Sequence, residues 1–145
     1  MIRAGTPADL PEITDLRTSV VENHMNMEEM AALGITHATT TAAMLSGDLG
    51  CWVAEVDARI VAFAMADRRD GDLFALFTRP GFEKRGFGSR LLTCCEVWLK
   101  EHGVGEAKLW TARESYAAKF YLKKGWEISR ETPADPRDVY LRKSL

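Results

Sequence analysis

The chain has 145 residues and a mass of 16.2 kDa. Because domains average roughly 100–200 residues, this length predicts one domain, residues 1–145. Hydrophobic residues make up 46% of the chain and charged residues 28%, a balance that excludes disordered, collagen-like and fibrous proteins. The net charge of −2 disfavours a nucleic acid as the main ligand, since proteins that bind one usually carry a basic surplus.

Neither a membrane segment nor a secretory signal is expected. No apolar run approaches the roughly 20 residues that span a bilayer, and the first residues lack a basic region followed by an apolar stretch. The three cysteines, Cys51, Cys94 and Cys95, form no metal-like C-x-x-C pair. We therefore expect a cytoplasmic, reduced protein without a bound metal, and the sequence is compatible with a homodimer.

Helical signals dominate the first part of the chain. A cap residue and a first-turn proline at residues 6–7 precede an amphipathic run that extends to about Asn23. Residues 24–35 are polar and rich in methionine, which indicates a mobile helix or a lid. Residues 36–46 predict a short helix that stops at Gly47.

Strand-like patterns follow the first helices. Three strands are predicted at residues 51–56, 59–68 and 73–78. The third is almost wholly apolar, as expected of a central strand covered on both faces. The remaining elements, in chain order, are a helix at 86–103, a strand at 106–112, a helix at 115–125, and strands near 126–130 and 138–144. This order predicts an α/β fold, a mixed and largely antiparallel sheet flanked by helices.

A glycine-rich turn between residues 77 and 89 joins a buried strand to a helix. The start of a helix presents unpaired N–H groups and a partial positive charge, so it can hold a phosphate. Gly86 and Gly88 have no side chain to block a close approach, and Lys84 and Arg85 add positive charge. The turn therefore predicts a phosphate site.

Two common phosphate motifs do not fit this turn. A P-loop places Lys and Ser/Thr directly after its second glycine, whereas Phe87 and Gly88 follow Gly86 here. A dinucleotide fingerprint needs a third glycine or alanine and an initial βαβ unit, whereas Leu91 stands at that position and antiparallel strands come first. A plain glycine turn without a ligand is the alternative interpretation.

Two motifs in order resemble the GNAT superfamily of acetyl-CoA-dependent N-acetyltransferases over about residues 51–130. The pyrophosphate-loop pattern Q/R-x-x-G-x-G/A falls on residues 83–88, with Glu83 in place of the leading Gln or Arg. Its flanking positions match at Leu76, Phe77, Pro80, Phe82, Ser89, Leu91 and Leu92. The second pattern, A-x-x-F-Y-x-x-x-G-[FW], matches Ala117, Phe120, Tyr121, Gly125 and Trp126.

The resemblance implies a site for acetyl-CoA. The turn would bind its pyrophosphate, with Glu83 turned outward because a carboxylate repels phosphate. It also implies that the strand at residues 73–78 diverges from the fifth strand of the sheet, so that free backbone groups bind the pantetheine amides. The predicted cofactor-binding residues are Leu76, Phe77, Thr78, Glu83, Lys84, Arg85, Gly86, Phe87, Gly88, Ser89 and Arg90.

The resemblance also implies a catalytic acid. Tyr121 stands where the family has a tyrosine beside the sulfur, and packing against Phe120 is its alternative role. The base is less evident, because Phe74 occupies the position where many relatives have a glutamate. Asp72, at the strand entrance, is the predicted base, acting through water, and a turn-forming role is its alternative.

Further candidates for the base are Glu22, His24, Glu28, Glu29 and Glu114. If the first helices fold over the sheet, the carboxylates among them gather with Asp72 near the thioester. Such a cluster would favour small cationic amines over anionic amino acids. The four tryptophans, Trp52, Trp98, Trp110 and Trp126, are expected in the core.

The leading functional hypothesis is an N-acetyltransferase that moves the acetyl group of acetyl-CoA to a primary amine of a small molecule or peptide. The first alternative is a catalytically silent acyl-CoA-binding or regulatory module, which would bind the thioester without consuming it. The second is a toxin-like acetyltransferase acting on charged tRNA, which the net charge of −2 disfavours.

Overall fold

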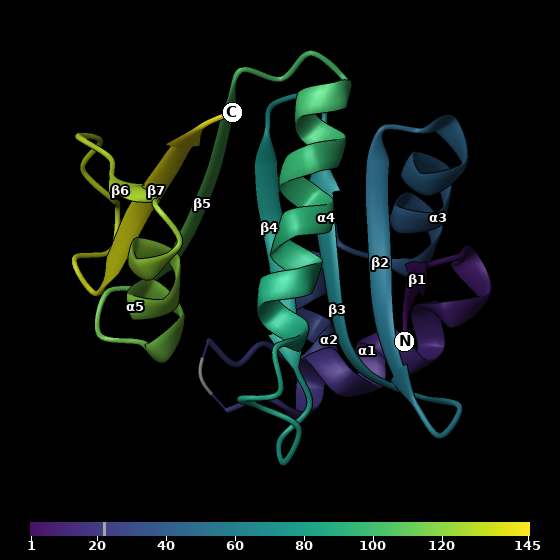
Figure 1. Ribbon diagram of the computed structural model, residues 1–145. Coiled ribbons are helices and arrows are strands. Elements are labelled where there is room, and N and C mark those ends of the chain that lie inside the picture. Colours follow the sequence, from purple (N-terminus) through teal and green to yellow (C-terminus); the bar gives the residue numbers. More distant parts are fainter. Residues whose placement is uncertain (22) are drawn as a thin grey trace.

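The computed structural model describes residues 1–21 and 23–145, and it shows a mixed sheet between two layers of helices (Figure 1). The strands are β1 (Ile2–Ala4), β2 (Leu49–Val56), β3 (Arg59–Asp67), β4 (Asp72–Thr78), β5 (Glu106–Ala112), β6 (Glu127–Ile128) and β7 (Asp138–Ser144). The helices are η1 (Pro7–Asp9), α1 (Leu10–Ser19), α2 (Met27–Ala32), α3 (His37–Ser46), α4 (Phe87–Glu101) and α5 (Tyr116–Lys123). Among the described residues, the strand order is β1-β2-β3-β4-β5-β7-β6, and only the β4–β5 pair is parallel.

This architecture confirms the predicted fold class and most of the predicted elements. The strand β5 and the helix α3 have the expected positions, and α3 is capped by Thr36 and ends at Gly47. The first helix ends at Ser19 rather than near Asn23. Strand β1 was not predicted, because three residues are too few to show an alternating pattern; it pairs with β2 at the edge of the sheet.

Helix α4 buries one apolar stripe against the sheet. The stripe consists of Leu91, Leu92, Cys95 and Leu99. Facing it, β3 contributes Ala62, Ala64 and Ala66, whose small side chains leave room for the helix. Each leucine removed from water contributes roughly 1.5–3 kcal/mol. This packing holds the start of α4 beside the end of β4 (Figure 1).

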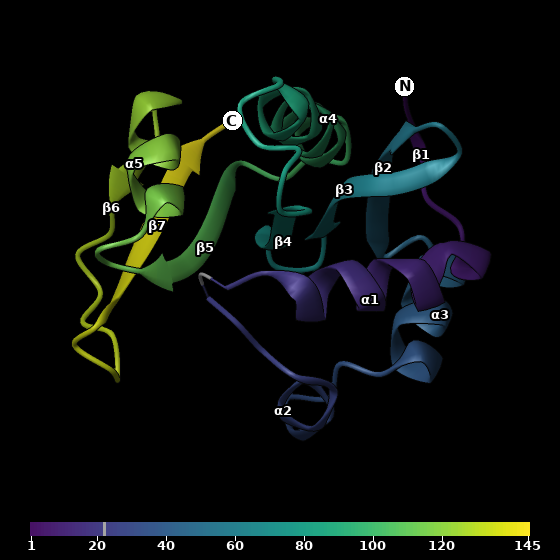
Figure 2. The same cartoon turned by 90° about the horizontal axis from the view of Figure 1, so that it is seen from below.

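The opposite face of the sheet is covered by the N-terminal helices. Leu10, Ile13 and Leu16 of α1 pack with Phe63 and Met65 of β3 in a second core. Figure 2 shows α4 and α5 on one side of the sheet and α1 and α3 on the other, with α2 beyond α1. Among the described residues, none of the helices combines the length and the apolar character that crossing a bilayer requires.

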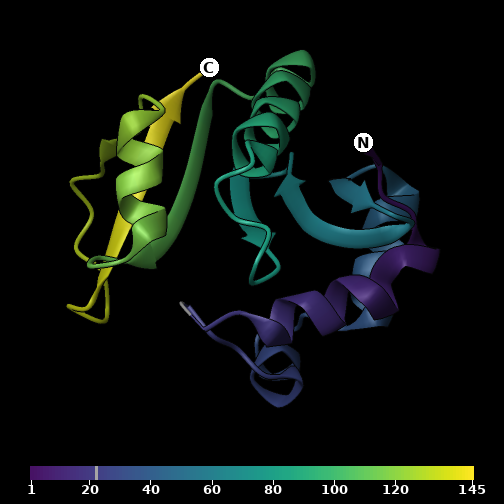
Figure 3. The same ribbon diagram turned by 60° about the horizontal axis from the view of Figure 1, so that its bottom comes forward.

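Strand β4 is central in the sheet, but it is not covered on both faces as predicted. The strand buried on both faces is β3, whereas Phe74, Leu76 and Phe77 of β4 stay partly exposed. The reason is that β4 pairs with β5 at one position alone, Asp72 opposite Lys108. Beyond that pair the two strands diverge, which leaves a gap at the end of β4 (Figures 1 and 3).

Trp110 also differs from the prediction, since half of its side-chain surface is exposed. The burial of β5 alternates, so that Ala107 and Leu109 point into the core. Trp110 follows Leu109 and therefore points to the other face. The other three tryptophans belong to the core or pack against it.

The closed end of the β4–β5 gap depends on Gly71. Its φ is +79°, and a Cβ atom at this position would collide with the backbone carbonyl oxygen of Glu106. The Gly71 carbonyl in turn accepts a hydrogen bond from the Lys108 N–H at 2.9 Å. Gly71 therefore allows the close approach that joins the two halves of the sheet.

Replacing Gly71 by alanine should lower the free energy of unfolding by at least about 2 kcal/mol, because positive φ and a backbone collision both oppose a Cβ there. Gly105→Ala is the matched control, since open space surrounds that position. Urea unfolding of both variants measures the difference, and equal stability of the two would contradict the role assigned to Gly71.

Candidate active site

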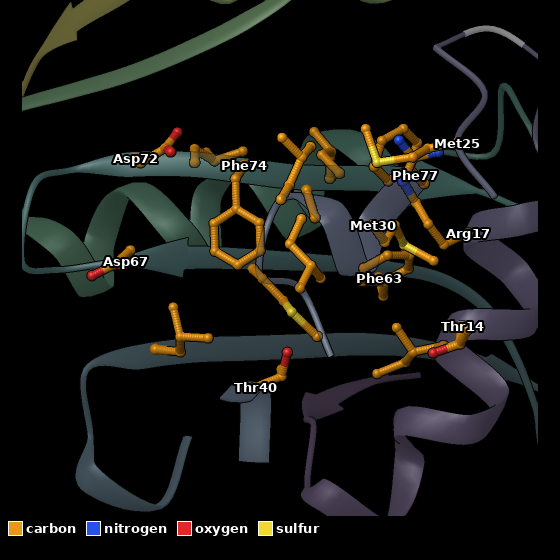
Figure 4. Close-up of a pocket in the computed structure, with 18 of the residues that line it drawn as sticks. Thr14, Arg17, Met25, Met30, Thr40, Phe63, Asp67, Asp72, Phe74 and Phe77 are labelled. Atoms are coloured by element: carbon orange, nitrogen blue, oxygen red, sulfur yellow. The ribbon is translucent and has the colours of Figure 1, made fainter. Parts of the chain in front are cut away.

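A cavity of about 790 Å³ lies between the N-terminal helices and the sheet. Its wall is formed by α1, the segment from 23 to 40, the facing sides of β3 and β4, and parts of β5 and α5. Figure 4 shows Arg17, Met25, Met30 and Phe77 toward one end, and Asp67 and Asp72 toward the other. The cavity therefore meets the gap between β4 and β5 from the side opposite α4.

The edge of β4 that faces β5 is free along the diverging part. Leu76, Phe77 and Thr78 pair with β3 on one side. On the other side, the described part of β5 pairs with β4 no further than Asp72. Backbone N–H and C=O groups that lack a strand partner are ready to pair with an extended ligand, as at any strand edge. These are the three backbone positions predicted to bind pantetheine.

The turn after β4 is held rigidly at its base. Arg79 is buried, donates to the Ile60 carbonyl oxygen at 3.3 Å and forms a 3.0 Å ion pair with Asp15. Its backbone N–H donates to the Val61 carbonyl at 2.7 Å. The residues that follow are therefore presented from a fixed point at the end of the strand.

The N-terminus of α4 has no side-chain cap among the described residues. Gly86, at the N-cap, has a φ of +84°. The first hydrogen bond of the helix is that from the Arg90 N–H to the Gly86 carbonyl. The N–H groups of Phe87, Gly88 and Ser89 therefore belong to the first turn, where an anion can accept from them.

The charged residues of the same turn are exposed. Lys84 and Arg85 reach solvent, and the Arg85 guanidinium lies 5.0 Å from the centre of the Phe82 ring. Glu83 accepts a hydrogen bond from the Gly81 N–H at 3.0 Å, so its carboxylate is engaged within its own turn. Arg90, one turn into α4, is exposed as well.

Tyr121 lies in the wall of the cavity and is 5% exposed. Its ring packs edge-to-face between Phe120 and Trp126, with centroids 5.4 and 5.3 Å away. Burial raises the pKa of the Tyr121 phenol far above its ordinary value. The side chain is thus protonated at physiological pH, but a pKa raised this far also makes the phenol a weaker acid. The ring is packed as the alternative interpretation expected.

Asp72 lies at the closed end of the gap, in the cavity wall. Burial, and then the nearby charge of Asp70, raise the pKa of Asp72 to about 6, while Lys108 opposes the shift. Its N–H donates to the Asp70 carboxylate at 3.1 Å. Asp72 therefore has turn geometry together with a pKa suited to exchanging protons near neutrality.

Among the described residues, the expected carboxylates do not all gather at the cavity. Glu28 and Glu114 are exposed and do not line the cavity. Glu29 lines it, as does Asp72, and Glu22 lies outside the described residues. His24 lines the cavity and its Nδ1 is 2.9 Å from the Val20 carbonyl oxygen. Glu28 of α2 and Glu114, in the loop after β5, therefore do not join the carboxylates that line the cavity.

Sequence reasoning missed Arg17, a cation in the cavity wall. Its guanidinium lies 4.0 Å from the centre of the Phe77 ring, and Nη2 donates to the Asn23 carbonyl at 2.9 Å. Nη1 is buried and has no hydrogen-bond partner within the part of the chain that the structure describes. The signal was present: Arg17 follows Ile13 by four positions, on the apolar face of α1.

Asn23 was also missed. Its side-chain amide donates from Nδ2 to the Thr111 hydroxyl at 2.9 Å, and its Oδ1 accepts from the Ala112 N–H at 3.0 Å. The residue has a φ of +56°, which asparagine tolerates better than most residues. The amide thus fixes the segment after α1 to the end of β5, across the open side of the gap.

Comparison with known proteins places this geometry in a family. The sequence model described as acetyltransferase (GNAT) domain matches residues 47–128, more than half of the chain. This range contains the turn, β4, β5 and α5. A comparison with curated protein sequences found no match.

Solved structures share the fold. A PaiA N-acetyltransferase from Thermoplasma acidophilum, in complex with coenzyme A, is 19% identical, with a TM-score of 0.80 over 100% of this chain and 98% of that chain. A ribosomal-protein-alanine N-acetyltransferase from Brucella melitensis is 20% identical, with a TM-score of 0.78 over 100% and 99%. An acetyltransferase of the GNAT family from Staphylococcus aureus is 14% identical, with a TM-score of 0.79 over 100% and 98%.

Identities this low show the fold alone, and the family match carries the assignment. Together they confirm the resemblance that the two sequence motifs predicted, and they support acetyl transfer as the general reaction. The chain belongs to the GNAT family of acetyltransferases.

Proposed function

We propose that the protein transfers the acetyl group of acetyl-CoA to a primary amine of a small molecule or peptide. The observation that carries this proposal is the gap between β4 and β5, which has an uncapped helix start at its open end and Tyr121 in the adjoining cavity. When bound, acetyl-CoA supplies the thioester, whose C–S bond breaks as the C–N bond to the amine forms.

The residues present fit this co-substrate. The N–H groups at the start of α4 would hold the pyrophosphate, with Lys84 and Arg85 adding positive charge. The free edge of β4 at Leu76, Phe77 and Thr78 would pair with the pantetheine amides. A main-chain N–H of the same edge would polarise the thioester carbonyl. Phe87 and Ser89 belong to the first turn, and Arg90 to the next.

Two side chains would handle protons. Tyr121 donates from its phenol to the departing sulfur, a role supported by its place in the cavity wall and in the second sequence motif. Asp72 accepts the proton of the amine through water, a role supported by its pKa of about 6. Neither group needs a metal.

The direct test is thiol release from acetyl-CoA in the presence of a panel of primary amines. The proposal expects release that depends on both the amine and the protein. Tight binding of acetyl-CoA without amine-dependent release would instead establish a silent acyl-CoA-binding module.

Replacing Gly88 by valine should weaken acetyl-CoA binding on the order of tenfold or more, because a branched side chain, bulkier than the glycine or alanine of the motif, obstructs the phosphate and costs charge-assisted hydrogen bonds. The fold should survive, since the nearest atom to the new Cβ is Phe120 Cζ at 3.6 Å. Calorimetry measures the affinity, with Gly105→Val as a control outside the turn. An unchanged dissociation constant for folded Gly88→Val would exclude the turn as the phosphate site.

The Tyr121→Phe variant keeps the ring between Phe120 and Trp126 and removes the proton. Turnover should fall by roughly 10²–10⁴-fold if acid catalysis has its usual value, with little change in melting temperature or acetyl-CoA affinity. Tyr116→Phe, on the exposed side of the same helix, is the control. Equal single-turnover rates for Tyr121→Phe and wild type would leave Tyr121 with a packing role alone.

The raised pKa of Asp72 predicts that both the activity and the stability of the protein depend on pH. Its folded-state pKa of about 6 lies above the ordinary value of about 3.9, so between these values the folded protein binds more protons than the unfolded chain. Ionised Asp72 therefore destabilises the fold as the pH rises through that window. Asp72→Asn should melt higher than wild type at pH 8, and the difference should vanish near pH 4.

If Asp72 is the base, turnover should rise through a pKa near 6, and Asp72→Asn should remove that limb. Asp70→Asn should move the limb to lower pH, because the Asp70 charge raises the pKa of Asp72. A limb that persists in Asp72→Asn assigns the base elsewhere, whatever the stability data show.

A further inference from the structure

Arg17 is the one cation of the cavity wall whose guanidinium has a buried nitrogen without an acceptor in the described chain. Nη2 is satisfied by the Asn23 carbonyl at 2.9 Å, and the plane lies on the Phe77 ring at 4.0 Å. Among the described residues, no protein group accepts a hydrogen bond from Nη1. Such groups are rare in folded proteins, since burying a charged donor without a partner is costly.

No carboxylate of the described residues neutralises Arg17. Glu29 is the acidic residue that acts on it electrostatically, but no ion pair within 4.0 Å joins the two among the described contacts. Glu29 is exposed, and its Oε1 accepts from the Asn26 N–H in the cap of α2. The positive charge of Arg17 is therefore left available to a ligand in the cavity.

The position of Arg17 relates it to the proposed reaction. Its partner Phe77 belongs to the free part of β4, whose backbone is proposed to bind pantetheine. The Phe77 ring lies on the cavity side of that strand (Figure 4). A group bound to Arg17 would therefore sit on the acceptor side of the strand that holds the cofactor.

Apolar side chains surround this end of the cavity. Met25, Met30 and Phe63 lie near Arg17 and Phe77 (Figure 4). Methionine is unbranched and polarizable, so it adapts to ligands of different shape. The surroundings thus suit an apolar body, and the guanidinium suits a planar anion, because its donors match the two oxygens of a carboxylate.

We propose that Arg17 binds the carboxylate of the acceptor, and that the acceptors are free amino acids with apolar side chains. This inference rests on the proposed acetyl transfer and specifies its substrate. It replaces the expected preference for cationic amines, whose basis was a carboxylate cluster that Glu28 and Glu114 do not join. The proposal also distinguishes free amino acids from peptide N-termini as acceptors, because a peptide has an amide in place of the carboxylate that Arg17 would bind.

The test compares each amino acid with its own amide: L-methionine, L-leucine and L-phenylalanine against methioninamide, leucinamide and phenylalaninamide. Amidation removes the carboxylate charge and keeps the side chain and the amine. It also makes the amine less basic, so the amide holds more free base at pH 7.5 and would react faster if nothing recognised the carboxylate. The inference expects kcat/KM to favour the acids on the order of tenfold or more.

The variants locate the preference. Arg17→Met keeps an apolar stem over Phe77 and should reduce the acid-to-amide ratio to one or less, and Arg17→Lys should retain part of it. Arg69→Met is the matched control, because Arg69 lines the other part of the cavity and pairs with Asp67 at 2.7 Å. It should leave the ratio as in wild type. Because each ratio is taken within one protein, partial unfolding cancels.

Calorimetry of the coenzyme A complex with L-methionine and methioninamide separates the two proposals. If L-methionine binds more tightly than methioninamide but neither releases thiol from acetyl-CoA, the carboxylate site is supported and the transfer is contradicted. Thiol release that favours the amides supports the transfer and overturns the carboxylate site. So does an acid-to-amide ratio that Arg17→Met leaves unchanged while acetyl-CoA affinity falls, since Nη1 would then serve the cofactor.

Discussion

The parting of β4 from β5 is the constraint on which the candidate site depends. The two strands are joined at the single pair Asp72–Lys108, where Gly71 permits the chain to approach the Glu106 carbonyl. Beyond this point β4 keeps an unpaired edge, whose free N–H and C=O groups can pair with an extended ligand. On the α4 side the opening leads to an uncapped helix start, and on the other side to the cavity.

The two halves of the site come from different parts of the chain. The family match covers residues 47–128, which include the glycine-rich turn, the β4 edge and Tyr121. Arg17 and Asn23 precede that range, on or after α1, and they face the same gap from the opposite side. Under the proposed function, the matched half would bind acetyl-CoA, and the N-terminal helices would supply the residues that meet the acceptor.

Much of the fold was predictable because local patterns agree with the packing. The stripe of α4 and the alternation of β5 both survive in the structure. Local patterns failed where a distant partner decides the outcome. Trp110 looked like a core residue, yet its place in the alternation of β5 turns it outward. Strand β4 looked doubly covered, yet its divergence from β5 leaves its side chains partly exposed.

The same division holds for the site. The glycine turn and Tyr121 carry motifs along the sequence, so they could be proposed before the structure. Asn23 reaches Thr111 across 88 positions, and no pattern in one sequence predicts such a contact. The position of Arg17 on the apolar face of α1 is visible in the sequence and could have been predicted. The exposure of Glu28 could not, because it depends on how α2 is oriented.

The most direct test of this account is a crystal structure of the protein with coenzyme A. The account predicts the pyrophosphate on the N–H groups of Phe87, Gly88 and Ser89, and the pantetheine amides on the free edge of β4 at Leu76–Thr78. Arg17 would remain on the opposite side of that strand, without contact to coenzyme A. Coenzyme A bound elsewhere, or β4 and β5 paired along their whole length in the complex, would contradict it.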